Sequence, residues 1–158
     1  MVRRLHAESL DFVGAAPVRL VFTRVLSAPP ERVFHALASD VSGWAEWFPA
    51  VTSIEPIDEG AGRDVRLSGG GRFRETVLAA KEPELYAYRV DVTNAPGVRA
   101  LVEEWRLAPD GAGTRVRWTF AADGPVLVRG ALRLAGPGLG WSFRGAMTRL
   151  EQRLATLP

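Results

Sequence analysis

Residues 139–157 read LGWSFRGAMTRLEQRLATL. The apolar residues in this stretch recur at steps of 4, 4, 3, 4 and 3, which is the spacing of one face of an α-helix. That face consists of Leu139, Phe143, Met147, Leu150, Leu154 and Leu157. A helix of about 18–20 residues is roughly 27–30 Å long, which is enough to cross a whole sheet. The stretch therefore predicts a long amphipathic helix that packs on a broad apolar surface.

The chain before this helix alternates between apolar and polar residues, as half-buried strands do. The alternating segments are 63–68, 72–80, 85–93, 100–108 and 113–121, and we expect two more strands at 18–26 and 50–57. Loops rich in glycine and proline join consecutive segments in the manner of hairpins. Each segment has one apolar and one polar face, which is typical of an antiparallel sheet covered on one side.

Two short helices are expected between the first two strands. Pro29 and Pro30 suit the first turn of a helix that runs to about Ala38, and a second helix covers Ser42 to Phe48. Residues 125–135 are also helix-like, and Gly136-Pro137-Gly138 should separate them from the long helix. The order predicts an α+β fold in which a curved antiparallel sheet of about seven strands wraps around the C-terminal helix.

Length and composition indicate one globular domain over residues 1–158, with residues 1–16 as an extension that we expect to be poorly ordered. No apolar run is long enough to span a membrane, and acidic residues precede any apolar segment at the N-terminus, so we predict a cytoplasmic protein without integral membrane association. The chain has no cysteine and two histidines, so we expect no metal site and no cofactor. The net charge is +2 and no basic run alternates with aromatics, which argues against nucleic-acid binding.

Two carboxylates interrupt the apolar faces of the strands. Glu75 lies between Phe73 and Val77, and Glu103 lies between Leu101 and Trp105. A carboxylate that faces an apolar interior is costly unless it is paired, hydrogen-bonded or protonated. Each is therefore either a group that orients a ligand or transfers a proton, or a structural partner in a buried ion pair. Two strand spacings should place them about 10 Å apart.

Aromatic residues dominate the same inward face. Trp105 and Trp118 are expected on neighbouring strands, where they can pair across the strands. We predict that the ligand-contacting residues are Phe34, Trp47, Phe48, Phe73, Tyr86, Tyr88, Trp105, Trp118, Phe143 and Met147. Many of these are equally consistent with an ordinary core. In the segment WAEWF (44–48), we expect Trp47 and Phe48 to point inward at the rim of a cavity and Trp44 to be partly exposed.

Several strings resemble the START-like SRPBCC superfamily, and in particular its polyketide cyclase/dehydrase-type proteins. The strings are SAPPERVFHAL (27–37), WAEWFPAV (44–51), RFRETV (72–77) with EP (82–83), EEWRL (103–107) and GTRVRWTF (113–120). The resemblance covers about residues 17–157. It implies a helix-grip fold with a cavity between the curved sheet and the long helix, in which members bind lipids, polyketides or similar molecules. The resemblance is weaker for function, because one fold hosts many activities.

Three functions remain open at this point. The first is a binding or carrier protein for a medium-sized hydrophobic molecule. The second is a polyketide cyclase or dehydratase with Glu75 and Glu103 as acid and base. The resemblance implies that aromatic cyclases carry an inward serine and arginine on the strand at 72–80. The inward positions expected in this chain are instead Phe73, Glu75, Val77 and Ala79, which argues against aromatic polyketide cyclisation. The third is a protein-interaction module that uses an exposed apolar patch, and solvent-accessible Trp44 and Trp47 would favour it. The sequence leaves the oligomeric state open.

Overall fold

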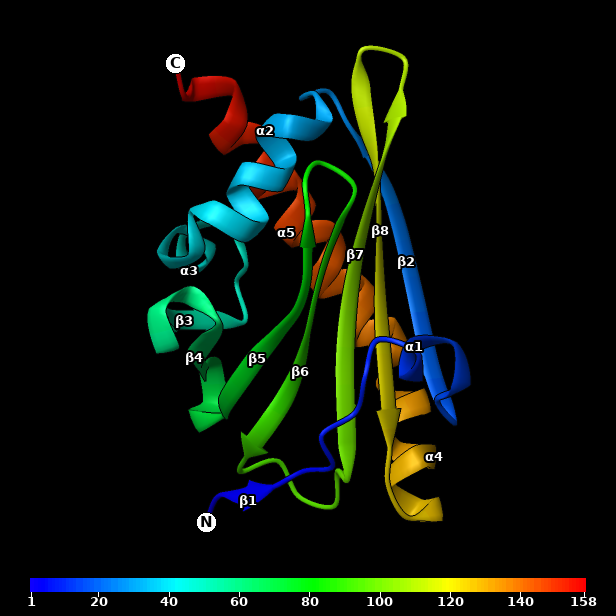
Figure 1. Cartoon of the computed structure of the whole chain (residues 1–158). Coiled ribbons are helices and arrows are strands. Elements are labelled where there is room, and N and C mark those ends of the chain that lie inside the picture. The colour runs from blue at the N-terminus through cyan, green and yellow to red at the C-terminus, as the bar shows by residue number, and fades with distance from the viewer.

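The computed structural model describes residues 1–158 and places eight antiparallel strands in one sheet. The sheet order is β2-β8-β7-β6-β5-β4-β3, and the two-residue β1 pairs with β6. The strands are β1 (Arg3–Arg4), β2 (Val18–Leu26), β3 (Val51–Ile57), β4 (Gly62–Leu67), β5 (Arg72–Lys81), β6 (Leu85–Thr93), β7 (Ala100–Asp110) and β8 (Gly113–Asp123). Figure 1 shows the long hairpins of β5–β6 and β7–β8 on one side and α5 running behind them. The predicted α+β sheet around a C-terminal helix is confirmed.

The helices include those that the sequence predicts between the first two long strands and at the C-terminus, together with α1, which the sequence does not predict. They are α1 (Phe12–Ala15), α2 (Pro30–Phe34), a π-helical turn (His35–Ser39), a 3-10 turn (Val41–Gly43), α3 (Trp44–Trp47), α4 (Val126–Leu134) and α5 (Gly136–Thr156). Pro137 stands in the first turn of α5, where its missing N–H costs no hydrogen bond. The break between α4 and α5 therefore falls at Ala135, directly before the predicted Gly-Pro-Gly segment.

The predicted apolar stripe of α5 packs on the sheet. Phe143, Met147, Leu150 and Leu154 are buried in the main core. Phe143 stacks on Trp118 of β8 with ring centroids 5.8 Å apart. Burial of each of these four side chains stabilises the folded state by roughly 1.5–3 kcal/mol. The stripe therefore determines which face of α5 packs on the sheet.

Two β-bulges between β5 and β6 change the alternation that the sequence suggested. The register steps from Arg74↔Val92 to Glu75↔Val90, so β6 carries one extra residue there. In consequence Thr93 is fully buried, whereas Val92 lies on the surface side beside Arg74. Strict alternation over 85–93 predicts that Val92 points inward with Tyr86 and Tyr88. This prediction is wrong, because the bulge turns Val92 to the other face.

The second bulge lies between the pairs Val77↔Tyr88 and Ala79↔Ala87. It makes Ala80 the partner of the inward Tyr86, so the predicted inward position of Ala79 is wrong for the same reason.

Residues 1–16 lie against the sheet. The β1 strand pairs with the end of β6, and Leu5 and Val13 are buried. The Arg3 guanidinium donates to the carbonyl oxygen of Val98 at 3.1 Å. None of the helices has the length and apolar character needed to cross a membrane.

Candidate functional site

A cavity of about 320 Å³ lies between the sheet and the helices α3, α4 and α5. Its volume is at the low end of the range of small-molecule sites, which is about 300–1,000 Å³. Of its 21 lining residues, 17 are hydrophobic. The polar exceptions are Arg63, Glu75, Thr93 and Glu103. The cavity is thus an apolar chamber with a few charged groups in its wall.

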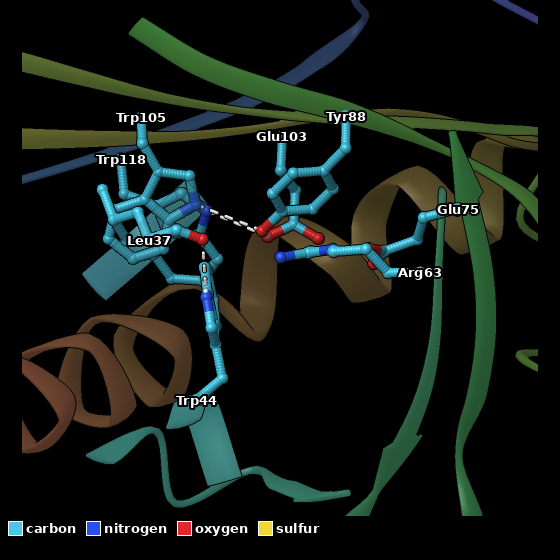
Figure 2. A network of polar contacts seen from close by, with 8 residues as sticks. All are labelled: Leu37, Trp44, Arg63, Glu75, Tyr88, Glu103, Trp105 and Trp118. Atoms are coloured by element: carbon cyan, nitrogen blue, oxygen red, sulfur yellow. Dashed lines mark hydrogen bonds and ion pairs between the residues drawn. The ribbon is translucent and has the colours of Figure 1, made fainter. Parts of the chain in front are cut away.

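Adjacent strands bring the charged groups together. Arg63 of β4 pairs in register with Glu75 of β5, and Tyr88 of β6 pairs with Glu103 of β7. Because directly opposed residues of antiparallel strands point to the same face, all four side chains enter the interior. Figure 2 shows Arg63 and Glu75 reaching from one side toward Tyr88 and Glu103.

Arg63 is the centre of this cluster and is almost completely buried. Its Nε donates to Glu75 Oε2 at 2.6 Å, and its Nη2 lies 2.5 Å from the same oxygen. The guanidinium also stacks on the Tyr88 ring, with Cζ 3.8 Å from the ring centroid. Its third nitrogen, Nη1, is buried and has no hydrogen-bond partner in the protein. A buried donor without a partner is costly, so Nη1 is a ready position for a ligand oxygen.

Glu103 accepts hydrogen bonds from two side chains through one oxygen. The Tyr88 hydroxyl donates to Glu103 Oε1 at 3.2 Å, and Trp118 Nε1 donates to it at 2.9 Å. Trp105 Nε1 in turn donates to the Tyr88 oxygen at 3.1 Å. Only Oε1 of Glu103 has partners in this network, as Figure 2 shows. Oε2 is therefore left for a ligand.

Burial changes the protonation of these groups. It raises the pKa of Glu103 from 4.5 to about 7, and the nearby Glu75 charge adds to the rise, while Arg63 opposes it. Burial also raises the pKa of Glu75, against the opposing effect of Arg63. The pKa of the Tyr88 hydroxyl lies well above 10 because of its burial and the Glu103 charge. At neutral pH, Tyr88 is therefore a fixed donor, and Glu103 exists in both protonation states.

Replacement of Glu103 by glutamine should remove one part of the pH dependence of stability. Because the folded-state pKa is raised, the contribution of Glu103 to the free energy of unfolding is fully present below about pH 4.5 and is lost as the pH rises through about 7. A rise of the Glu103 pKa from 4.5 to about 7 corresponds to a change of roughly 3 kcal/mol in the free energy of unfolding.

Urea unfolding of both proteins near about pH 5 and about pH 8 measures this effect. Glutamine keeps an oxygen that can accept from Tyr88 and Trp118, so the network survives the change. The free energy of unfolding of Glu103→Gln, relative to that of the wild type, should rise from the lower to the higher pH. An equal change of stability with pH in both proteins would contradict the raised pKa of Glu103.

A second hollow of about 270 Å³ lies on the other side of Arg63. It is lined by the π-helical turn, the 3-10 turn and strands β3 to β6, and Tyr86 belongs to its wall. Arg63 is the one residue that lines both spaces. The Arg63–Glu75 pair therefore forms part of the partition between the cavity and this hollow.

The two tryptophans of the α3 segment are both buried. Trp44 is 2% exposed, so the predicted partial exposure of Trp44 is wrong. Its Nε1 donates to the Leu37 carbonyl oxygen at 2.9 Å, and its ring meets Trp105 edge to face at 5.5 Å. Trp44 and Phe48 form part of the cavity wall, and the interaction surface that exposed tryptophans would have provided is absent.

The predicted ligand-contacting residues divide into three groups. Four of them line the cavity, namely Phe48, Phe73, Tyr88 and Trp118. Tyr86 lines the second hollow. The others belong to the packed core, namely Phe34, Trp47, Trp105, Phe143 and Met147. Trp105 and Trp118 are directly opposed and stack at 5.4 Å, as the expected strand order required.

Sequence reasoning missed Arg63. Arg72 and Arg74 are the arginines nearest to Glu75 in the chain, but they are exposed on the other face of β5. The available signal was the alternation of β4 itself, because Arg63 shares the parity of Val65 and Leu67. An arginine on the inward face of one strand, opposite a glutamate on the inward face of the next, indicates a buried ion pair.

The comparisons with known proteins agree with the fold. The model of a family described as polyketide cyclase/dehydrase and lipid transport matches residues 17–155. An uncharacterized protein of Mycobacterium tuberculosis strain H37Rv is 28% identical over 148 residues, which cover 90% of this chain and 88% of that protein.

Two solved structures show the same fold. XoxI from Bacillus cereus aligns with a TM-score of 0.72 and 15% identity, over 88% of this chain and 96% of that chain. A START superfamily protein from Mycobacterium smegmatis aligns with a TM-score of 0.66 and 17% identity, over 89% of this chain and 99% of that chain. At such identities the likeness concerns the fold, and function has to be argued from the site.

Proposed function

Because the chain belongs to the polyketide cyclase/dehydrase and lipid transport family and has its START-like fold, we propose that it is a binding or carrier protein for a small hydrophobic molecule. The ligand lies in the cavity between the sheet and α5. The single observation that carries the proposal is the wall of this cavity, which is apolar except for Thr93 and one charged cluster. Such a wall is typical of sites that bind an apolar body and orient it by one or two polar contacts. The cytoplasmic location expected from the sequence remains a prediction.

The charged cluster restricts the chemistry of the ligand. Arg63 Nη1 can only donate a hydrogen bond, and it has no partner in the protein. Glu103 Oε2 donates when the carboxyl is protonated and accepts when it is ionised. The ligand that fits is an apolar molecule with an oxygen at one end, such as a carbonyl or carboxyl group. The rest of the ligand contacts the apolar wall.

Calorimetric titration with two probes of one carbon skeleton tests this assignment. The probes are 2-acetylnaphthalene and 2-ethylnaphthalene, which differ in the carbonyl oxygen. We expect both to bind because of the apolar wall, and the ketone to bind about tenfold more tightly because it pairs with a buried charged donor. Equal affinities would contradict the role of Arg63, and binding of neither probe would contradict the proposed function.

A second candidate function is acid–base catalysis on a ligand of the same class. The observation that favours it is the pKa of about 7 for Glu103, inside the cavity and hydrogen-bonded to Tyr88, since a general acid or base works best near the ambient pH. The ion pair with Arg63 makes Glu75 a structural partner rather than a base. The variant Glu103→Gln separates the carrier from the enzyme. A carrier should retain both its ligand affinity and its function in this variant. An enzyme should retain its ligand affinity and lose turnover.

A further inference from the structure

One surface of the protein is apolar, exposed and not used by the cavity. It is formed by α4 and the first turns of α5, and its large side chains are Val126, Leu127, Leu134 and Trp141. Their exposed fractions are 79%, 87%, 85% and 75%. The other four tryptophans of the chain are at most 3% exposed. Figure 1 shows α4 at one end of the molecule, beyond the end of β8. We call these four residues the α4 face.

The α4 face is held in place rather than loosely attached. Arg129 pairs with Asp123 at 3.0 Å, and Arg133 donates to the Pro17 carbonyl oxygen at 2.8 Å. Gly97 of the β6–β7 loop approaches α4 so closely that a Cβ at this position would come within 2.3 Å of Val128 Cγ2. The protein therefore holds its exposed apolar side chains on an anchored helix.

The segment that carries the α4 face contains basic residues and no acidic ones. Residues 124–150 contain Arg129, Arg133, Arg144 and Arg149 and no acidic residue, although the whole chain has a net charge of only +2. Arg144 and Arg149 are exposed and make no ion pair. A twofold contact between two copies would place arginines against arginines, which is unfavourable. An anionic partner fits the surface better.

From these observations we propose that the α4 face docks the protein on a bilayer that contains anionic lipids. The leucines of α4 and Trp141 of α5, together with the arginines of both helices, are typical of a surface that lies in the membrane interface. The apolar side chains enter the boundary between headgroups and acyl chains, and the arginines meet the lipid phosphates. The inner side of the same helix carries Leu132, which lines the cavity. The docked surface and the cavity wall are therefore two sides of one element.

Co-sedimentation of the ligand-free protein with vesicles tests the docking. The vesicles are phosphatidylcholine alone, or an equimolar mixture of phosphatidylcholine and phosphatidylglycerol. We expect binding to the mixture that weakens with added salt, and a blue shift of tryptophan emission, because Trp141 is the one exposed indole. Trp141→Phe should remove the shift and keep most of the binding.

Matched variants separate a surface effect from a loss of folding. Leu127→Glu with Leu134→Glu should abolish vesicle binding, and Arg144→Glu with Arg149→Glu should weaken it by about fivefold or more for each arginine. Arg117→Glu is the control, since Arg117 is exposed on β8 and lies outside residues 124–150. Thermal unfolding should be unchanged in all of them, because each replaced side chain is exposed.

The proposal is overturned if the wild type does not bind the mixed vesicles, or if Leu127→Glu with Leu134→Glu binds as the wild type does. It is also overturned if the wild type is a dimer that this variant converts to a monomer, because the α4 face is then a contact between copies. The docking extends the proposed carrier function, but the two fail separately. Vesicle binding needs no ligand, and the naphthalene titration needs no membrane.

Discussion

Replacement of Arg63 by methionine should lower the free energy of unfolding by about 3–5 kcal/mol at neutral pH. The variant leaves Glu75 buried without its partner, and it also removes the stacking of the guanidinium on the Tyr88 ring. The loss should be smaller near pH 5, because a protonated Glu75 carries no charge and tolerates burial. Urea unfolding at the two pH values measures both effects.

Two controls show whether the loss comes from the unpaired carboxylate. The double variant Arg63→Met with Glu75→Leu replaces the pair by apolar side chains and should recover most of the stability, since a buried pair often contributes little net stability compared with apolar side chains of similar size. Arg117→Met removes an exposed arginine and should change the stability by less than about 0.5 kcal/mol. A stability of Arg63→Met within about 1 kcal/mol of the wild type would contradict the buried ion pair.

The second large effect is expected from filling the cavity. Val65 of β4 and Leu101 of β7 both line it with apolar side chains. Val65→Phe with Leu101→Phe should weaken the binding of 2-acetylnaphthalene by at least about tenfold, because the added rings occupy the space of the ligand. The stability should change by less than about 2 kcal/mol, since side chains that enter an empty space do not overpack the core.

Val25→Phe is the matched control for the cavity, because Val25 is exposed on β2 and lies away from the cavity wall. It should leave the affinity for the probe unchanged. Unchanged affinity in the double variant would place the ligand elsewhere. A destabilisation of the double variant by much more than about 3 kcal/mol would show that side chains fill this space in solution.

The sequence predicts those parts of the site that depend on the regular alternation within a strand. Glu75 and Glu103 are inward for this reason, and Trp105 lies opposite Trp118 because consecutive strands pair as hairpins. The stripe on α5 is predictable in the same way from its helical spacing. Each of these features depends on neighbours that are close in the chain or in the next strand.

The remaining features depend on contacts that no local pattern contains. The bulge that turns Thr93 inward and Val92 outward breaks the period of two, and nothing in the composition of β6 marks it. Trp44 is buried because Trp105 and Tyr88, distant in sequence, cover its ring. Arg63 was predictable in principle, but its role follows only from the pairing of β4 with β5.

The central claim is that the cavity holds an apolar ligand whose oxygen pairs with Arg63. A crystal structure of the protein with 2-acetylnaphthalene tests it most directly. The account predicts the naphthalene rings between the sheet and α5, with the ketone oxygen within about 3 Å of Arg63 Nη1. A ligand bound elsewhere on the protein, or bound in the cavity with its oxygen directed away from Arg63 and Glu103, would contradict the account.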